Sequence, residues 1–223
     1  MHYVTLEEAI EDKEFARYLS LREFDKCIEM LVNRTAVQEL CQFIEEEGID
    51  PFEYITVFEQ DLLPTIRMSK IVVPNGIVRL AQNTFSYRTD IEEIELPETL
   101  NIIGERAFNS CGIYALHIPN SVRYIGAYCF KYCQNLETLR LPDDLRELES
   151  GMFLYCSNLE EVILPKNLEI INPNIFDHCN SMQRIYYQGT RDEWDSKVKL
   201  PNSRWMPPVL DYIECTDGPI TID

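Results

Sequence analysis

The segment IYALHIPNSVRYIGAYCFKYCQNLETLRLP, residues 113–142, contains the same apolar pattern twice. In each copy, apolar residues stand six, three and one positions before a proline, first Pro119 and then Pro142. The pattern predicts a short strand with one buried face that ends where proline removes a backbone N–H. The two sets are Ile113, Leu116 and Ile118, and then Leu136, Leu139 and Leu141.

This unit recurs along two thirds of the chain. Five prolines follow one another at intervals of about 23 residues, one interval being a residue shorter than the other three. A phenylalanine stands eleven positions after each proline, and a sixth, incomplete unit keeps Met182, Ile185 and Tyr187 in phase but has Gln188 in place of the proline. A fixed period of this length indicates a solenoid, in which the apolar positions of each coil pack on those of the next. The phased positions are Pro74, Pro97, Pro119, Pro142 and Pro165, and Phe85, Phe108, Phe130, Phe153 and Phe176.

Four of the eight cysteines share one position of the repeat, three positions after the phenylalanine. One interpretation is a ladder of metal-binding or redox-active thiols. The other, which we favour, is a column of small buried residues, because no CxxC pair or His-rich spacing accompanies the cysteines. The four residues are Cys111, Cys133, Cys156 and Cys179.

The segments 113–142 and 156–179 (CSNLEEVILPKNLEIINPNIFDHC) resemble the bacterial BspA-like class of leucine-rich repeats. Residues 185–198 and 212–222 are similar to the Trp helix and terminal hairpin that usually close such proteins. The resemblance implies a binding scaffold, since proteins of this class are commonly surface or secreted adhesins. The fold predicted is an α/β repeat solenoid with coils of about 23 residues, an α-helical N-terminal cap and a C-terminal cap.

The predicted domains are a helical N-terminal domain or cap (1–63), the leucine-rich-repeat solenoid (64–188) and a C-terminal cap (189–223). Capping boxes and apolar stripes at helical spacing predict helices over residues 5–60. We expect this bundle to cover the apolar end of the solenoid. An acidic docking domain that binds a basic protein is the alternative. At the other end, Trp194, Tyr212 and Trp205 are expected to cover the last coil.

Charge and composition limit the partners. The net charge is −18, and residues 1–63 carry 16 acidic and 5 basic side chains. Such a chain repels phosphate backbones, so we expect no nucleic-acid partner and favour a basic protein. No apolar run approaches the length of a membrane span, and the start, MHYVTLEEAIEDKEF, lacks the pattern of a signal peptide. These features predict a cytoplasmic protein with reduced thiols and no membrane association.

Motifs for catalysis are missing from the sequence. No nucleophile elbow, Walker loop, dinucleotide fingerprint or zinc-protease motif occurs, and the adjacent His178 and Cys179 would point in opposite directions. Carboxylate pairs are plentiful, but solvated strand flanks commonly carry them. We therefore predict a protein that is not an enzyme and has no catalytic residues, cofactor or metal site.

Two groups of residues are candidates for partner binding. The first is the outward column two positions before each proline, which is chemically mixed. The second lies thirteen positions after each proline and is rich in aromatic residues, which suit a protein or sugar partner or else stack on one another. The candidates are Glu95, His117, Arg140, Ile163 and Tyr186 in the first group, and Tyr87, Tyr132, Tyr155 and His178 in the second.

These observations predict a non-catalytic, intracellular protein-binding scaffold that uses its repeat surface. Two alternatives remain open. One is an adhesin or particle-attachment protein. The other is a phage-type inhibitor that binds a basic host protein through the acidic residues 1–63.

Overall fold

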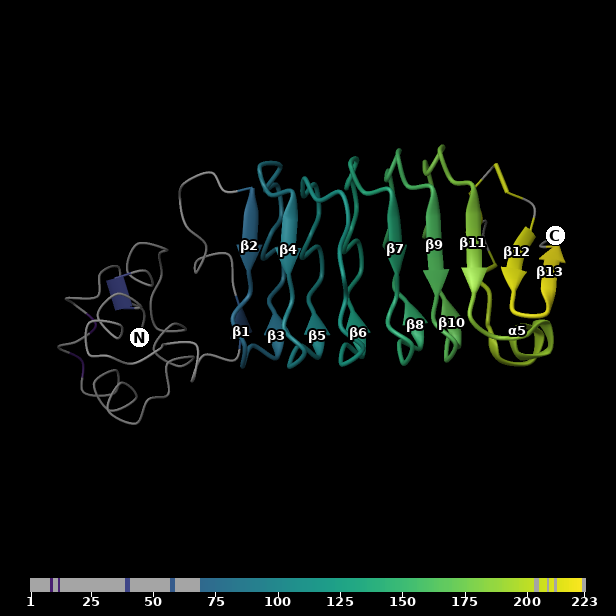
Figure 1. Cartoon of the computed structure of the whole chain (residues 1–223), viewed down its shortest axis with the longest axis horizontal. Helices are drawn as coiled ribbons and strands as arrows, with labels where there is room; N and C mark the ends of the chain where they lie inside the picture. Colours follow the sequence, from purple (N-terminus) through teal and green to yellow (C-terminus); the bar gives the residue numbers. More distant parts are fainter. Residues whose placement is uncertain are drawn as a thin grey trace.

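The computed structural model describes residues 69–202, 205–207, 209, 210 and 212–221, together with Ala9, Asp12, Glu39, Leu40 and β1 (Val57–Phe58). From residue 69 onward the chain winds into successive coils, which follow one another along the long axis of the molecule (Figure 1). There are about five turns of roughly 23 residues each, as the proline spacing predicts.

Most coils contribute one strand that ends before the proline position and one that follows it. We call these the front and back strands. Their pairing is parallel, with equivalent residues of successive coils side by side, so that Ile71 lies opposite Ile94 and Leu139 opposite Val162. The front strands are β2 (Lys70–Val72), β4 (Glu93–Glu95), β7 (Thr138–Arg140), β9 (Glu161–Leu164) and β11 (Arg184–Tyr187). The back strands are β1, β3 (Arg79–Leu80), β5 (Ile102–Ile103), β6 (Tyr124–Ile125), β8 (Glu147–Leu148) and β10 (Ile170–Ile171).

The repeat solenoid is confirmed, but its class is narrower than the α/β class predicted. Within the described coils the segments between strands are turns, and the one α-helix among residues 69–202 comes after the last coil. The molecule is therefore a β-solenoid. Turns suffice because each coil pairs its backbone with the next, as in the bond from the Phe85 N–H to the Ala107 carbonyl at 2.7 Å.

The phenylalanines form the centre of the core, as predicted. All five are fully buried, and successive rings stack nearly parallel with centroids 5.3, 5.3, 5.6 and 5.4 Å apart. A ring in such a column buries both faces against its neighbours, which a single coil could not provide. The column therefore contacts every coil from Phe85 to Phe176.

The in-phase cysteines are buried beside this column, which confirms that they are core residues. Cys133, Cys156 and Cys179 each place Sγ 2.9–3.1 Å from the backbone carbonyl of a phenylalanine in the preceding coil, so the thiols donate across coils. Burial raises the pKa of the Cys179 thiol to about 12 and that of Cys156 well above its usual value. Both effects keep the thiols protonated and unreactive.

One coil is a residue shorter than the others. Between Cys111 and Ile113 stands a single residue, Gly112, where the next coil has Gln134 and Asn135. A Cβ on Gly112 would lie 2.4 Å from the Thr89 carbonyl oxygen, so only glycine fits this tight turn. The Asn135 side chain donates to the Gly112 carbonyl at 3.1 Å and so bridges the shortened turn.

The front sheet is interrupted directly after this turn. Residues 115–117 occupy a front-strand position but have no strand pairing, so β2–β4 is one sheet and β7, β9 and β11 belong to another. Tyr114 still pairs weakly with the coils on either side, through bonds of 3.4 Å to Glu92 and 3.3 Å from Glu137. A continuous front sheet was expected from the repeat, but residues 115–117 form no strand, although Tyr114 keeps the register of Glu92 and Glu137.

The last coil is followed by the helix and the hairpin that the sequence predicts. The helix α5 (Arg191–Lys197) begins at a capping box formed by Thr190 and Glu193. Trp194 is buried on its inner side, edge-on to Tyr187 at 5.1 Å and stacked on Trp205 at 5.9 Å. The hairpin of β12 (Tyr212–Cys215) and β13 (Gly218–Thr221) extends the front sheet beyond β11.

One detail of this end was predicted wrongly. Tyr212 was expected to cover the core but is 43% exposed, whereas its neighbour Ile213 is fully buried. The difference arises because successive side chains of a strand point to opposite faces, and Ile213 occupies the inner one. Trp205 is buried, as expected.

Most of the predicted helical domain lies outside the described residues. Ala9, Glu39 and Leu40 have helical conformation, and Leu40 is buried as its place in a predicted apolar stripe requires. The prediction of helix over residues 5–60 is wrong at Val57–Phe58, because β1 pairs there with β3. The domain boundaries themselves stay a prediction.

Candidate protein-binding surface

A row of residues runs along the solenoid thirteen positions after each proline, all exposed except the partly buried Ser110, and we call it the aromatic row. Its members are joined by the backbone: the Tyr132 N–H donates to the Leu154 carbonyl at 3.0 Å, and the Tyr155 N–H donates to the Asp177 carbonyl at 2.9 Å. All have left-handed backbone conformation, with φ between 56° and 65°. This shared geometry projects every side chain of the row in the same way. The members are Tyr87, Ser110, Tyr132, Tyr155 and His178.

Three rings at the C-terminal end of the row form a stack. Tyr132 and Tyr155 are 4.8 Å apart at an interplanar angle of 12°, and Tyr155 and His178 are 4.2 Å apart at 3°. The rings remain accessible at their edges, since Tyr132 is 39% and Tyr155 36% exposed. The two interpretations of the row are therefore compatible, because the rings stack on one another and still present a surface.

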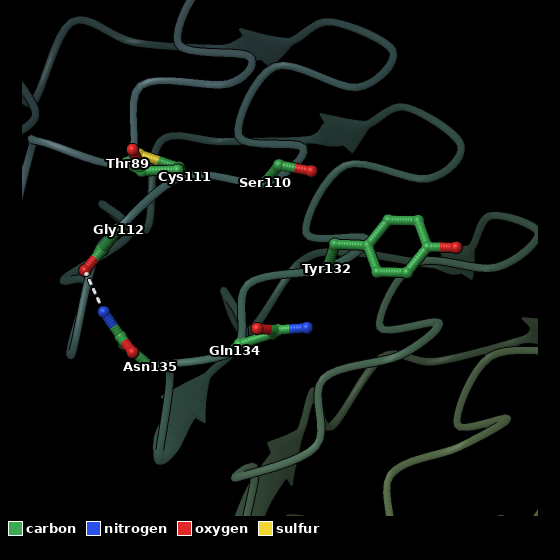
Figure 2. A pocket seen from close by; sticks show the side chains of 7 residues that line it. All are labelled: Thr89, Ser110, Cys111, Gly112, Tyr132, Gln134 and Asn135. Atoms are coloured by element: carbon green, nitrogen blue, oxygen red, sulfur yellow. Dashed lines mark hydrogen bonds between the residues drawn. The ribbon is translucent and has the colours of Figure 1, made fainter.

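The stack ends at Ser110, which has no ring. Beyond it Tyr87 is 74% exposed, about twice the exposure of Tyr132, and among the described residues it stacks on no other ring. Beside the break lies a hollow of about 370 Å³, lined by Ser110, Tyr132, the short turn at Gly112 and polar side chains (Figure 2). The repeat pattern gave no sign of this hollow.

Cations accompany the tyrosines at this part of the surface. The Lys131 ammonium lies 5.0 Å from the centroid of the Tyr132 ring and 5.4 Å from that of Tyr128. The Arg106 guanidinium also lies over Tyr128, 5.1 Å from the ring centroid. Such contacts are worth about 0.5–1 kcal/mol at exposed sites and leave the cations able to move.

The other predicted residues lie on the front face. Strand register places Arg140, Ile163 and Tyr186 side by side, and Glu214 of β12 follows Tyr186. Arg140 is exposed, whereas Ile163 and Tyr186 are partly buried. Glu95 is exposed on the separate sheet of β2 and β4, and His117 is exposed on the segment without strand pairing. The structure thus divides a column that was expected to be continuous.

Charged groups of the front face are largely paired with one another. Lys70 contacts Glu93 at 2.8 Å and also pairs with Glu95. The hydrogen bonds to these two carboxylates raise the pKa of the Lys70 ammonium. Arg184 pairs with Glu161 and lies 4.0 Å from Glu214. Exposed pairs of this kind are worth about 0–1 kcal/mol each. They reduce the charge that the face offers to a partner.

Arg140 is held by hydrogen bonds rather than free in solvent. Its guanidinium donates to the Gln188 side chain at 2.6 Å and to Asp143 at 2.9 Å, and Gln188 donates to the Leu164 carbonyl at 3.2 Å. Gln188 replaces the repeat's proline and therefore supplies the amide that orients this arginine.

The described residues offer little to catalysis or metal binding. Among them no cluster of three or more His, Cys, Asp or Glu side chains is arranged to hold a metal ion. His178 stacks on Tyr155, while the adjacent Cys179 is buried and donates to the Phe153 carbonyl, so the two do not form a dyad. Burial raises the pKa of Glu149, with the repulsion of Glu147 adding to it, but Tyr124 is its hydrogen-bond partner. No helix in the described part of the chain has the length and apolar character needed to cross a bilayer.

Comparison with known proteins agrees with the repeat geometry. The profile of the BspA type leucine rich repeat region matches residues 58–183 in six copies. The chain belongs to this family. No curated protein matches the chain.

Solved structures of bacterial leucine-rich-repeat proteins have the same fold. A leucine rich cell surface protein from Faecalibacterium prausnitzii A2-165 is 20% identical with a TM-score of 0.55, and the match covers 59% of this chain and 35% of that one. A leucine-rich repeat protein from Eubacterium ventriosum is 22% identical with a TM-score of 0.51, over 53% and 32% of the two chains. A leucine rich repeat protein of T. pallidum is 24% identical with a TM-score of 0.52, over 54% and 59%. The BspA type chain thus spans about a third of the first two proteins and somewhat over half of the third.

Proposed function

We propose that this BspA type chain is a non-catalytic scaffold that binds a protein partner through its repeat surface. The observation that carries the proposal is the aromatic row, in which exposed rings are fixed by stacking and by the coil backbone. A rigid tyrosine offers a large contact area and loses little conformational freedom on binding. The five-stranded front sheet supplies a second flat surface, with Arg140 already oriented by Gln188.

Affinity in this proposal comes from a few anchors. Tyrosine and arginine dominate interfaces of this kind, and the candidates are Tyr132, Tyr155, Arg140 and Tyr186. The remaining sequence candidates, Glu95, His117, Ile163, Tyr87 and His178, act as surrounding contacts. Truncation of a central anchor is expected to cost on the order of 2 kcal/mol or more.

The experiment is affinity capture with the full chain, followed by direct binding measurements on the captured protein. Variants Arg140→Ala, Tyr186→Ala, Tyr132→Asn and Tyr155→Asn replace the anchors, and asparagine is chosen for the two positions with positive φ because it tolerates that conformation. Lys197→Ala on α5 serves as the matched surface control. Binding that is unchanged in all four variants of confirmed fold would reject the repeat surface as the interface.

The acidic residues 1–63 are the competing interface. A basic partner bound there would lose affinity in a variant carrying Glu45→Lys, Glu46→Lys and Glu47→Lys, while the four repeat-surface variants would bind like the parent. That result would mean that the N-terminal domain binds the partner and that the solenoid only supports this domain.

The site of action is part of the proposal. We favour an intracellular protein, and attachment at the cell surface is the alternative, supported by the similarity to the F. prausnitzii cell surface protein. Fractionation of the source cells, with an antibody to the full chain, distinguishes the two.

The ends have a supporting role in the same proposal. In it Trp194 and the hairpin cover the last coil, and the helical cap predicted for residues 1–63 would cover the first. The burial of Trp194 between Tyr187 and Trp205 supports the first assignment.

A further inference from the structure

We propose that the break at Ser110 is a subsite for a single aromatic side chain of the protein partner. The inference rests on the proposed function and adds to it the chemistry of one contact. The inserted ring would take the place that a tyrosine or histidine of the row takes in the three following coils.

The backbone places Ser110 in line with the rings on both sides. The Tyr87 N–H donates to the Asn109 carbonyl at 2.8 Å, and the Ser110 N–H donates to the Lys131 carbonyl at 2.7 Å. The φ of Ser110 is 56°, close to the 62° of Tyr87 and the 59° of Tyr132. Ser110 therefore has the geometry of a ring position without a ring.

The space at this position matches one ring. The phenylalanine rings of these same coils are 5.3 Å apart, so the Tyr87 and Tyr132 positions are two such steps apart, and Ser110 puts no ring at the step between them. Figure 2 shows Ser110 and Tyr132 on one side of the hollow and Gly112 on the other, with the Tyr132 ring pointing away from Gly112. The short turn at Gly112 borders the hollow and carries no side chain, where the next coil has Gln134 and Asn135.

The charges around the hollow favour a neutral aromatic ring over a cation. Lys131 lies over Tyr132, and Arg88 is bonded to Asp90 at 2.9 Å, so the nearby acid is already paired with a cation. An incoming guanidinium would meet the Lys131 ammonium. One face of Tyr132 stacks on Tyr155 and the Lys131 ammonium lies over the ring, so an incoming aromatic ring would displace Lys131 from the remaining face. It would stack on Tyr132 there and offer its own π face to the displaced ammonium.

The first test uses 4-methylphenol, the side chain of tyrosine, as the probe for the full chain. Chemical shifts of ¹³C-labelled tyrosine rings are followed during titration. We expect Tyr132 to shift with saturation and the rings far from the hollow to remain unchanged. Methyl β-D-glucopyranoside and n-propylguanidinium are titrated in parallel, and stronger binding of either would overturn the assignment to an aromatic side chain.

The decisive variant is Ser110→Tyr, which fills the gap with the residue type of its neighbours. It is expected to fold, because the other positions of the row carry rings on the same backbone, and to weaken 4-methylphenol binding by at least about tenfold. Ser181→Tyr adds an exposed tyrosine away from the row and should bind like the parent. Equal affinity of the parent and Ser110→Tyr would overturn the proposal.

A second pair of variants gives the same test without filling the gap. Tyr132→Asn removes the stacking platform and should also weaken binding at least about tenfold, whereas Tyr212→Asn removes an exposed ring of the terminal hairpin and should have no effect. Equal loss in both variants would show that the probe binds exposed rings in general and not the gap.

The subsite and the proposed function fail in different ways. If 4-methylphenol does not bind at the gap while the anchor variants still weaken partner binding, the subsite is rejected and the proposed scaffold function is retained. If the probe binds at the gap but no repeat-surface variant affects the partner, the scaffold proposal is rejected and the inserted ring cannot be the partner's.

Discussion

At the scale of single residues, the phenylalanines link each coil to the next. Each of the three central rings, such as Phe130, buries both faces against the ring before and the ring after, 5.3 Å and 5.6 Å away. The phase of these residues was readable from the sequence because eleven positions separate each from its proline. Their contact as a stack follows from that phase.

We expect Phe130→Ala to lower the free energy of unfolding by about 3–5 kcal/mol. The change leaves a cavity inside the column and removes the stacking partner of both Phe108 and Phe153. Urea unfolding followed by circular dichroism measures it. Tyr132→Asn is the matched aromatic control on the surface, and equal effects of the two changes would contradict the distinction between core and row.

The buried thiols make stability depend on pH above neutrality. Burial raises the pKa of Cys111 to about 12 and that of Cys156 well above its usual value, whereas thiols of the unfolded chain ionise near about 8.5. Between these values the unfolded chain has lost protons that the folded chain keeps. The free energy of unfolding should therefore fall as pH rises above about 9, by up to about 1.4 kcal/mol per pH unit for each thiol.

Urea unfolding at about pH 8 and about pH 10 tests this pH dependence. Cys156→Ala should show a smaller loss of stability between the two pH values than the parent, and Ser157→Ala, its neighbour, should show the parent's loss. The same loss in all three proteins would mean that the thiols of the folded chain ionise normally.

At the scale of elements, the short turn at Gly112 is the feature that most affects the surface. It coincides with the interruption of the front sheet and borders the hollow at Ser110. The shorter interval between Pro97 and Pro119 signals that a residue is missing, but the interval alone does not say where in the coil. The phases of Cys111 and Ile113 place it between these two residues, and the close approach of Gly112 to the Thr89 carbonyl shows why glycine is needed there.

We expect Gly112→Ala to destabilise the protein by about 1–3 kcal/mol, because its Cβ would overlap backbone atoms of the preceding coil. The measurement is again the free energy of unfolding. Gln134→Ala, in the corresponding turn of the next coil, should stay within about 0.5 kcal/mol of the parent. A Gly112→Ala protein as stable as the parent would mean that the turn can relax.

Prediction from sequence succeeded where residues repeat and was weaker where they do not. The phenylalanine column, the buried cysteines and most of the strands could be predicted from their positions within the repeat alone. The stacking of Tyr155 on His178 and the exposure of Tyr212 depend on side-chain directions that the period does not encode. The candidate surface could be predicted because aromatic residues recur at one position of the repeat. The break in the row could not, because a serine such as Ser110 is common at any surface position.

At the scale of the whole molecule, charge should act on the rate of binding. The chain carries −18, of which most lies in residues 1–63, while the front face pairs its own charges. Long-range attraction of a basic partner therefore arises mainly away from the proposed contacts. Such attraction speeds encounter more than it strengthens the final complex.

We expect association with a basic partner to slow roughly tenfold between about 50 mM and about 500 mM salt, with little change in dissociation. Stopped-flow or surface-based kinetics measures both rates. The variant with Glu45→Lys, Glu46→Lys and Glu47→Lys should show a weaker salt dependence of association, and Ser181→Tyr should match the parent. A salt effect confined to dissociation would contradict this division of roles.

The spacing of the exposed rings also limits the shape of a partner. Neighbouring rings of the aromatic row lie 4.8 and 4.2 Å apart, whereas the side chains on one face of an extended peptide repeat about every 6.8 Å. A strand laid along the row drifts from the rings by about 2 to 2.6 Å at each contact and is out of step within two coils. A linear peptide can therefore contact only one or two successive coils in register at a time. A partner that contacts more coils must itself repeat at the spacing of the coils or cross them at an angle.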